Sequence, residues 1–195
     1  WRKRVGWLVG CNYTPRYAIN QLEFWQADTF DLKTIDQELG WAESIGFNSM
    51  RVFLHDLLWR QEGFLDRVER YLDVSNRHGI GTLFVLFDSC WDPNPKLGKQ
   101  RAPTPGVHNS GWLQSPGADM FFLARDNPAA FEPTLDFVSG VIERFKNDDR
   151  IHGWDLWNEP DNTNVNSYGA ADPGAVKQQL IAGLVSRVFD RARSV

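Results

Sequence analysis

The sequence predicts an α/β protein in which four parallel strands alternate with helices. Short apolar runs of strand length alternate with stretches whose apolar residues recur at helical spacing. Such alternation is typical of a parallel sheet covered by helices. A length of 195 residues suits one domain with a sizeable core. Because a barrel needs eight such units, the chain is either a small open sheet or the first half of a (β/α)8 barrel.

The first unit and the second strand occupy the N-terminal quarter of the chain. Val5–Asn12 is an apolar run short enough for a buried strand. Apolar residues then recur at helical spacing over 32–46, and Asp28 or Asp31 is the expected N-cap. Phe47–His55 follows as the second strand.

The third strand is predicted to be buried on both faces. A helical pattern over 64–79 precedes it, and Ile80–Asp88 is almost continuously apolar, as a covered strand should be. The stretch 89–127 contains five of the ten prolines and several glycines. A structureless insert of this length is uncommon and usually functional.

The fourth unit carries the most informative stretch of the chain. A helix over 133–146 leads into a strand over Ile151–Trp157, and a further amphipathic helix is expected to begin at Pro173. Pro160 cannot donate to a sheet ladder and keeps its predecessor extended, so Glu159 is pinned at the strand tip beside Asn158. In an α/β barrel the chemistry is done at that tip. The plainer interpretation is a strand that ends in a turn and happens to carry an acid.

Composition excludes several partners and favours flat ligands. The net charge of −4 gives no basic surface for nucleic acid, and no apolar stretch is long enough to span a membrane. Nine Trp and thirteen Phe exceed what the core obviously needs, and exposed Trp stacks on flat ligand faces. No Cys/His cluster or glycine-rich loop has metal-ligand or nucleotide-binding spacing, so no metal or cofactor is expected.

The two cysteines are expected to be free thiols. Cys11 and Cys90 lie near the ends of the first and third predicted strands. Strands two apart in a sheet are separated by roughly 9–10 Å, which is beyond disulfide reach. Free thiols favour a reducing compartment and therefore a cytoplasmic address.

The strand ends, taken together, resemble the retaining (β/α)8 glycosidases, most closely glycoside hydrolase family 5. The segment 46–51, Gly-Phe-Asn-Ser-Met-Arg, is similar to the Gly-Phe-Asn-x-x-Arg pattern of that clan, and 157–160 is similar to its Asn-Glu-Pro signature. A complete strand–helix unit separates the two motifs. The segments 12–15 and 87–91 also look like a subgroup that includes β-mannosidases. The resemblance covers nearly the whole chain and implies the N-terminal half of the barrel.

This resemblance implies a role for each motif residue. Glu159 would be the general acid/base, Asn158 the donor to the sugar 2-hydroxyl, and Arg51 the partner that orients the nucleophile. The nucleophile of the family, a glutamate on strand seven, is not among these 195 residues. Tryptophan walls would partly desolvate Glu159 and keep it protonated. Asp155 is the expected partner of Arg51, and a purely structural ion pair is the alternative.

Further candidates for sugar contact lie at strand ends and in the insert. Asp88 is expected to bind a sugar hydroxyl, although strand spacing would also let it pair with Glu159 as a second carboxylate. The alternatives are a loop cap for His55, a loop anchor for Trp91 and loop packing for the insert residues. The substrate-binding candidates are His55, Asp88, Trp91, Tyr13, His108, Asn109 and Trp112, with Arg16 and Glu23 at the first strand's rim.

The predicted function is a retaining β-glycosidase that cleaves β-linked hexosides of the mannoside or glucoside type by double displacement. The expected partners are an oligosaccharide or glycoside and the C-terminal half of the barrel. The alternatives are a non-catalytic carbohydrate-binding half barrel and an endo-acting β-1,4-glucanase or xylanase. An aldolase would need a lysine at a strand end, and no predicted strand ends in one.

Overall fold

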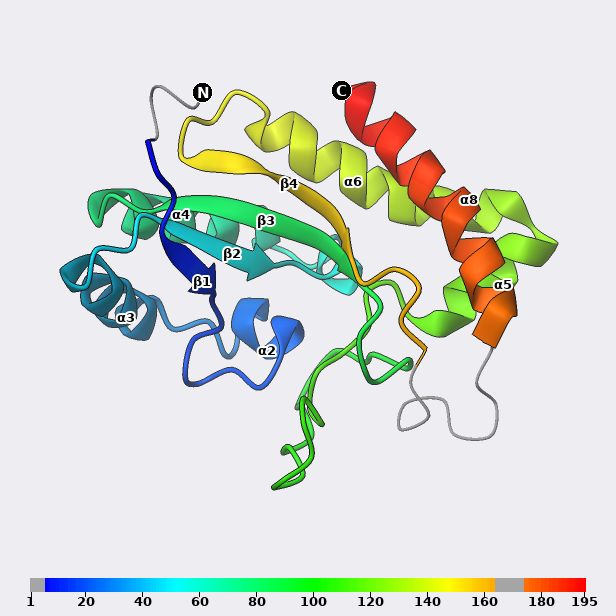
Figure 1. Ribbon diagram of the computed structural model, residues 1–195, viewed down its shortest axis with the longest axis horizontal. Coiled ribbons are helices and arrows are strands. Elements are labelled where there is room, and N and C mark those ends of the chain that lie inside the picture. Colours follow the sequence, from blue (N-terminus) through cyan, green and yellow to red (C-terminus); the bar gives the residue numbers. More distant parts are fainter. Residues whose placement is uncertain (1–5, 164–173) are drawn as a thin grey trace.

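The computed structural model describes residues 6–163 and 174–195. The predicted strand start at Val5 and helix start at Pro173 lie outside these residues. The described residues form one four-stranded parallel sheet in the order β1-β2-β3-β4 (Figure 1). The strands are β1 (Gly10–Asn12), β2 (Ser49–Phe53), β3 (Gly81–Asp88) and β4 (Ile151–Asn158).

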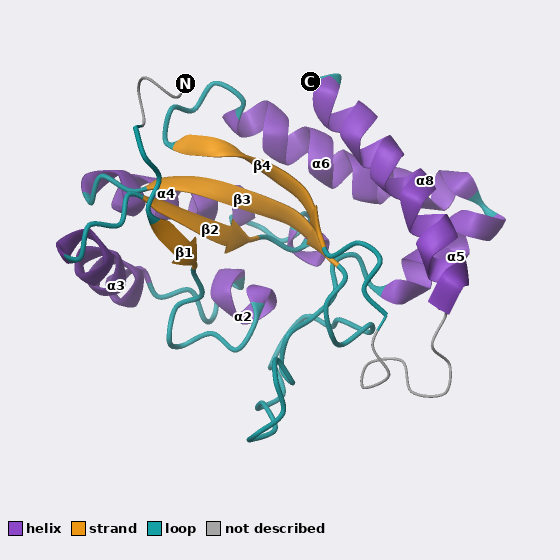
Figure 2. Cartoon of the chain, in the orientation of Figure 1, coloured by secondary structure: helices purple, strands orange, loops and turns teal. Residues whose placement is uncertain are grey.

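A helix follows each strand, as expected for right-handed crossovers between parallel strands. In Figure 2, α4 lies behind β2 and β3, and α6 and α8 run side by side next to β4. The main helices are α3 (Leu32–Ser44), α4 (Phe64–Arg77), α6 (Glu132–Phe145) and α8 (Gly174–Arg193), with short helices α2 (Gln21–Trp25), η1 (Asp56–Leu58), α5 (Ala118–Asp126) and η2 (Pro128–Phe131). This is the predicted α/β architecture, half of a (β/α)8 barrel.

The core lies between the sheet and its helices and is rich in aromatic rings. Tyr71 of α4 packs against Phe84 of β3 and Trp25 of α2, with ring centroids 6.2 and 5.5 Å apart. Most phenylalanines are buried, so the core absorbs most of the aromatic excess that the composition suggested would stack on ligands. The strand register brings polar residues together, because Asn12 pairs with Arg51 and Asp88 pairs with Asn158 at the carboxyl ends.

Several elements differ from the sequence-based expectation. A buried strand from Val5 was expected, but β1 is three residues long and exposed. It is exposed because it lies at the edge of the sheet, with β2 as its neighbour. α2 was not expected, and α5 begins inside the stretch 89–127, which leaves 89–117 as the irregular insert. This insert extends away from the sheet (Figure 1).

Two other expectations, a buried third strand and free cysteines, are confirmed. β3 is buried along almost its whole length. Cys11 and Cys90 are both free, the first exposed and the second buried. Within the described ranges, no helix is both long and apolar enough to cross a membrane.

Candidate active site

The carboxyl ends of the four strands and the insert enclose a cavity of about 360 Å³. Each strand delivers a side chain to it because the ends of parallel strands meet at one edge of the sheet. The lining residues are Asn12, Thr14, Arg51, Phe53, Asp88, Cys90, Trp91, His108, Asn109, Trp112, Asn158, Glu159 and Asn162.

Arg51 is held in the cavity from three sides. Its Nε and Nη2 donate to one carboxylate oxygen of Asp155, at 3.0 and 2.5 Å, so the expected ion pair is present. Nη1 donates to Asn12 Oδ1 at 3.2 Å, and the guanidinium carbon lies 4.7 Å from the centre of the Phe53 ring. Both members of the ion pair are about three-quarters covered. Such a fixed guanidinium can orient a carboxylate or a polar ligand group.

The Asn158 amide lies between a cation and an anion. Its Oδ1 accepts a hydrogen bond from Arg51 Nη2 at 3.0 Å, and its Nδ2 donates to Asp88 Oδ1 at 3.1 Å. Turning the amide over would place its NH2 against the guanidinium and its oxygen against the carboxylate. The neighbouring charges therefore fix which end of the amide faces which way.

Asp88 is a buried carboxylate that the protein itself satisfies. Only 1% of the residue is exposed. Its Oδ2 accepts from Trp112 Nε1 at 2.6 Å, and its Oδ1 accepts from the Cys90 backbone N–H at 2.9 Å as well as from Asn158. Burial raises the pKa of this carboxyl, and the hydrogen bonds oppose that shift without cancelling it. Asp88 thus borders the cavity, but its oxygens already bind protein donors.

Glu159 lies at the cavity rim, and its backbone is not extended as the following proline led us to expect. Its φ of +44° is left-handed, and its carboxylate accepts from Asn162 Nδ2 at 2.7 Å. The residue is exposed, so the expectation that tryptophan walls would desolvate it is not met. The reason is geometric, because the aromatic rings cover the insert side of the cavity. Beneath this turn, buried Lys177 of α8 donates to the Asn162 carbonyl and lies over the Phe121 ring.

The insert supplies an aromatic and amide wall. Trp91 and His108 meet edge to face at 5.5 Å, and Trp112 meets the edge of Phe53 at 5.3 Å. Asn109 lines the same cavity. Trp91 and Asn109 both have left-handed backbones, with φ values of 72° and 50°. The structure therefore brings all four insert candidates to the cavity.

His55 is not brought to the cavity. Its ring is fully buried and caps η1, where Nδ1 accepts from the Leu57 N–H at 3.2 Å and lies 3.0 Å from Asp56 Oδ1. This is the loop-cap alternative that the sequence left open. A buried capping ring is in no position to meet a sugar.

The candidates at the rim of β1 also lie elsewhere. Tyr13 is buried and donates its hydroxyl to Glu38 at 2.9 Å, and burial raises the pKa of that hydroxyl. Arg16 pairs with the same carboxylate at 3.1 Å. Glu23 instead accepts from the Ile19 N–H at the start of α2. These residues tie the first loop to α3 rather than line the cavity.

Several lining residues were not among the sequence-based candidates. Asn12 ends β1, Thr14 follows it and Phe53 ends β2, so strand-end position was the available signal. Asn162, three residues after Glu159, carried no motif. Cys90 follows β3, and burial first, then the nearby carboxylates, raises the pKa of its thiol. The cysteine therefore stays a neutral thiol.

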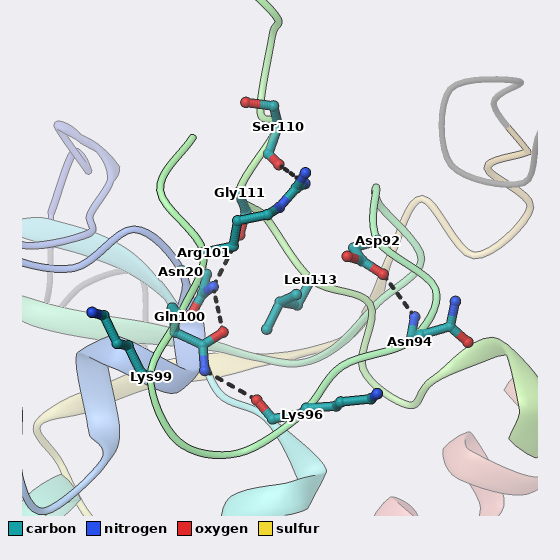
Figure 3. A pocket seen from close by; sticks show the side chains of 10 residues that line it. All are labelled: Asn20, Asp92, Asn94, Lys96, Lys99, Gln100, Arg101, Ser110, Gly111 and Leu113. Carbon is teal, nitrogen blue, oxygen red and sulfur yellow. Dashed lines mark hydrogen bonds between the residues drawn. The ribbon is translucent and has the colours of Figure 1, made fainter. Parts of the chain in front are cut away.

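A second hollow of about 370 Å³ lies along the insert, but its polar groups do not converge. Figure 3 shows the ammonium groups of Lys96 and Lys99 pointing to opposite sides. Arg101 donates to the Ser110 carbonyl at 2.8 Å, and Asn20 donates to Gln100 at 3.0 Å. Over 6–163 and 174–195, no group of three His, Cys, Asp or Glu residues is arranged to hold a metal ion.

Comparison with solved structures shows a fold like that of glycoside hydrolase family 5. No family model and no curated protein matches the sequence. The chain is 15% identical to a GH5_18 variant from Bifidobacterium longum subsp. longum ATCC 55813, solved in complex with Manb1-4GlcNAc. That match covers 89% of this chain and 39% of that chain at a TM-score of 0.58.

Two further structures are similar over most of the chain. The endo-1,4-beta-mannanase from Rhizomucor miehei is 14% identical, with 90% of this chain and 52% of that chain covered and a TM-score of 0.58. A GH5_18 variant from Streptomyces cattleya, in complex with Manb1-4GlcNAc, is 13% identical, with 92% and 42% covered and a TM-score of 0.59. The chain thus spans about half or less of the length of these structures.

Proposed function

We propose that residues 1–195 are the N-terminal half of the (β/α)8 catalytic domain of a retaining β-glycosidase. One observation carries the proposal. Glu159 and Asn158, at the tip of β4, line the same cavity as Arg51, which is fixed by its ion pair with Asp155. This places an acid, an amide donor and a guanidinium around one sugar-sized space. The family 5-like fold and the motif resemblance support the same interpretation.

In this proposal each residue performs one part of a double displacement. A nucleophilic carboxylate from the other half of the barrel attacks the anomeric carbon while Glu159 gives its proton to the departing glycosidic oxygen. Water then gives a proton back to Glu159 and attacks the same carbon, which releases the sugar and frees the nucleophile. Arg51 orients the nucleophile, and a remaining N–H of Asn158 Nδ2 binds the 2-hydroxyl, a contact that tightens in the transition state.

The substrate that we propose is a β-linked hexoside of the mannoside or glucoside type. Two similar structures contain Manb1-4GlcNAc, and a third is an endo-1,4-beta-mannanase. The indole and imidazole rings of Trp91 and His108 offer flat surfaces for a sugar ring. A panel of aryl β-mannoside, β-glucoside and β-xyloside substrates tests this choice and separates it from a glucanase or xylanase.

We also propose that further strands pair with β1 and β4 to close the barrel. These two strands are the edges of the described sheet. Open edges favour pairing with another strand, and barrel closure removes them. The carboxylates that line the described cavity are Asp88 and Glu159. Both oxygens of Asp88 already accept hydrogen bonds from the protein, so in this proposal the nucleophile comes from the other half of the barrel.

The decisive experiment replaces Glu159 in the full-length protein. Glu159→Gln should reduce hydrolysis of a β-linked disaccharide by about a hundredfold or more, because this leaving group needs a proton. An activated aryl glycoside should keep much of its glycosylation rate. Asp161→Asn is the matched control, since Asp161 is exposed and does not line the cavity. Wild-type turnover of the disaccharide by Glu159→Gln would refute the assignment.

One observation favours a second candidate, a carbohydrate-binding half barrel without catalysis. The cavity in the described residues combines aromatic walls with a single exposed carboxylate, which suffices for binding but not for double displacement. Calorimetry with mannobiose, alongside the aryl glycoside assay, discriminates the two. Binding without any hydrolysis by the full-length protein would favour this candidate.

A further inference from the structure

We propose that Asp88 is a positioning residue that fixes both the Asn158 amide and the Trp112 wall for the sugar. The inference rests on the proposed function and deepens it. It differs from the sequence-based expectation that Asp88 itself binds a sugar hydroxyl. Its basis is the hydrogen-bond geometry of one buried carboxylate.

The two oxygens of Asp88 serve different parts of the cavity. Oδ1 accepts from Asn158 Nδ2 at 3.1 Å and from the Cys90 N–H at 2.9 Å, and Oδ2 accepts from Trp112 Nε1 at 2.6 Å. With the residue 1% exposed, water cannot replace these donors cheaply. The carboxylate therefore connects the end of β4 to the insert.

On the β4 side, Asp88 leaves Asn158 with one N–H for a ligand. An amide nitrogen has two hydrogens. The bond to Asp88 uses one of them, and the nitrogen also lies 3.6 Å from Cys90 Sγ, a weak acceptor that a sugar hydroxyl would displace. The oxygen of the same amide is held by Arg51 Nη2 at 3.0 Å, which prevents rotation. The remaining N–H is thus presented in a single direction, as a contact to a sugar 2-hydroxyl requires.

On the insert side, Asp88 anchors the segment that carries the wall. Besides the side-chain bond to Trp112, the backbone N–H of Asp88 donates to Ser115 at 2.7 Å, and the Ser115 N–H donates back at 2.8 Å. Trp112 also packs edge to face on Phe53 at 5.3 Å. Together with the Asp92 N–H, which donates to the Trp112 carbonyl at 3.1 Å, these contacts hold the indole in place.

A carboxylate is required at position 88 because both side-chain oxygens must accept hydrogen bonds. In Asp88→Asn, one of the two positions becomes an NH2 group. Whichever way that amide turns, its NH2 faces either the Trp112 N–H or the donors Asn158 and Cys90. Two donors pointing at one another is unfavourable in a buried site. The substitution therefore breaks one side of the connection and, because the charge is lost, weakens the hydrogen bond on the other side, while keeping the size of the side chain.

The test compares a β-hexoside with its 2-deoxy analogue in the full-length protein. Asp88→Asn should lower kcat/KM for the parent glycoside about ten- to a hundredfold. The 2-deoxy substrate lacks the group that Asn158 would bind, so the ratio of the two kcat/KM values should fall by about tenfold. Trp112→Phe keeps the ring and removes the N–H, and it should affect both substrates equally. Asp119→Asn is the matched control, because Asp119 is exposed, lies two residues after the insert and does not line the cavity.

A readout without turnover tests the same connection. In a spectrum of 15N-labelled protein, the Trp112 indole N–H should resonate downfield, because it donates to a carboxylate at 2.6 Å. Asp88→Asn should shift this resonance upfield, and Asp119→Asn should not. This chemical shift can be measured even if the full-length protein hydrolyses no glycoside. A lack of hydrolysis would refute the proposed function but not the positioning role. An unmoved indole resonance, or equal loss of kcat/KM on both substrates, would overturn the positioning role.

Discussion

At the scale of single residues, backbone strain is concentrated at the cavity. Among the described residues, the non-glycine residues with left-handed backbone are Trp91, Asn109 and Glu159, and all three line it. Asparagine tolerates this conformation, but a tryptophan rarely adopts it. Strained residues persist where the surroundings hold them, and they cluster at functional sites. The side chain directions at the cavity therefore depend on backbone geometry that costs stability.

Trp91 allows this cost to be measured. Trp91→Ala and Trp91→Gly both remove the indole, but only glycine adopts a φ of 72° without strain. We expect Trp91→Gly to have a free energy of unfolding about 1 kcal/mol higher than Trp91→Ala. Urea denaturation of the two variants measures the difference. Equal stabilities, or a more stable alanine variant, would mean that position 91 is unstrained.

The residue scale also shows where sequence reasoning succeeds. Pro160 predicted that the strand stops beside it, and β4 does end at Asn158, although Glu159 itself is left-handed and not extended. Asp155 was the expected partner of Arg51, and the two form an ion pair. The exposure of Glu159 could not be predicted, because it depends on which side of the cavity the insert covers. Similarly, no local pattern indicated that Asp88 would be satisfied by donors 2, 24 and 70 residues away along the chain.

At the scale of elements, one histidine joins α3 to the end of α4. His78 Nε2 lies 2.9 Å from Asp36 Oδ1, and Nδ1 lies 2.7 Å from Glu43 Oε2. Partial burial disfavours the charged ring, but the hydrogen bonds to Glu43 and Asp36 outweigh it and raise the pKa of His78. The ring also packs on Gly40, where an added Cβ would lie 3.3 Å from Cε1.

This pair of contacts predicts a pH-dependent stability. A raised pKa means that the folded state binds the His78 proton more tightly than the unfolded state does. The stabilisation should be complete below about pH 6.5, the unfolded value, and should disappear as the pH rises through the folded pKa. Because Asp36 and Glu43 are about half exposed, we expect the protonated His78 to stabilise the folded state by less than about 1 kcal/mol.

The measurement is the free energy of unfolding of the wild type and of His78→Gln. Their difference should be larger at about pH 5.5 than at about pH 9. Arg77→Gln is a useful control, since Arg77 contacts the same Asp36 but does not titrate in this range. A difference that grows with pH would contradict a raised pKa of His78 in the folded protein.

The elements themselves were predictable in proportion to their periodicity. α3, α4 and α6 carry apolar residues at helical spacing, and their positions match the prediction to within a few residues. α2 is five residues long, and its signal was the Asn20 cap with Glu23 three residues later. α5 follows a proline-rich segment, whose composition concealed the helical run of Ala118–Asp126.

At the scale of the whole molecule, the sheet has two open edges. β1 and β4 flank it, and the segment before β1 exposes Trp7 and Val9. Alternation of strand and helix predicted a parallel sheet, and the strand-end motifs distinguished a half barrel from an open sheet. The pairing of a sheet edge is a long-range contact, so no local pattern could specify it.

A protein consisting of residues 1–195 should therefore self-associate with rising concentration. Val9→Lys places a charge beside the β1 edge and should shift association to higher concentration by about tenfold. Leu97→Lys is the matched control, because Leu97 is equally exposed but lies in the insert. Sedimentation velocity over a concentration series gives the result. A monomer at all concentrations would show that the edges are already protected.

Lys177 carries a consequence for how variants of this protein are interpreted. It lies on α8 and outside the cavity, yet its ammonium binds the carbonyl of the residue whose amide holds Glu159. A genetic screen or sequence survey restricted to cavity positions would overlook it. Loss of its charge would be recorded as a remote helix substitution, although its effect would be felt at the acid itself.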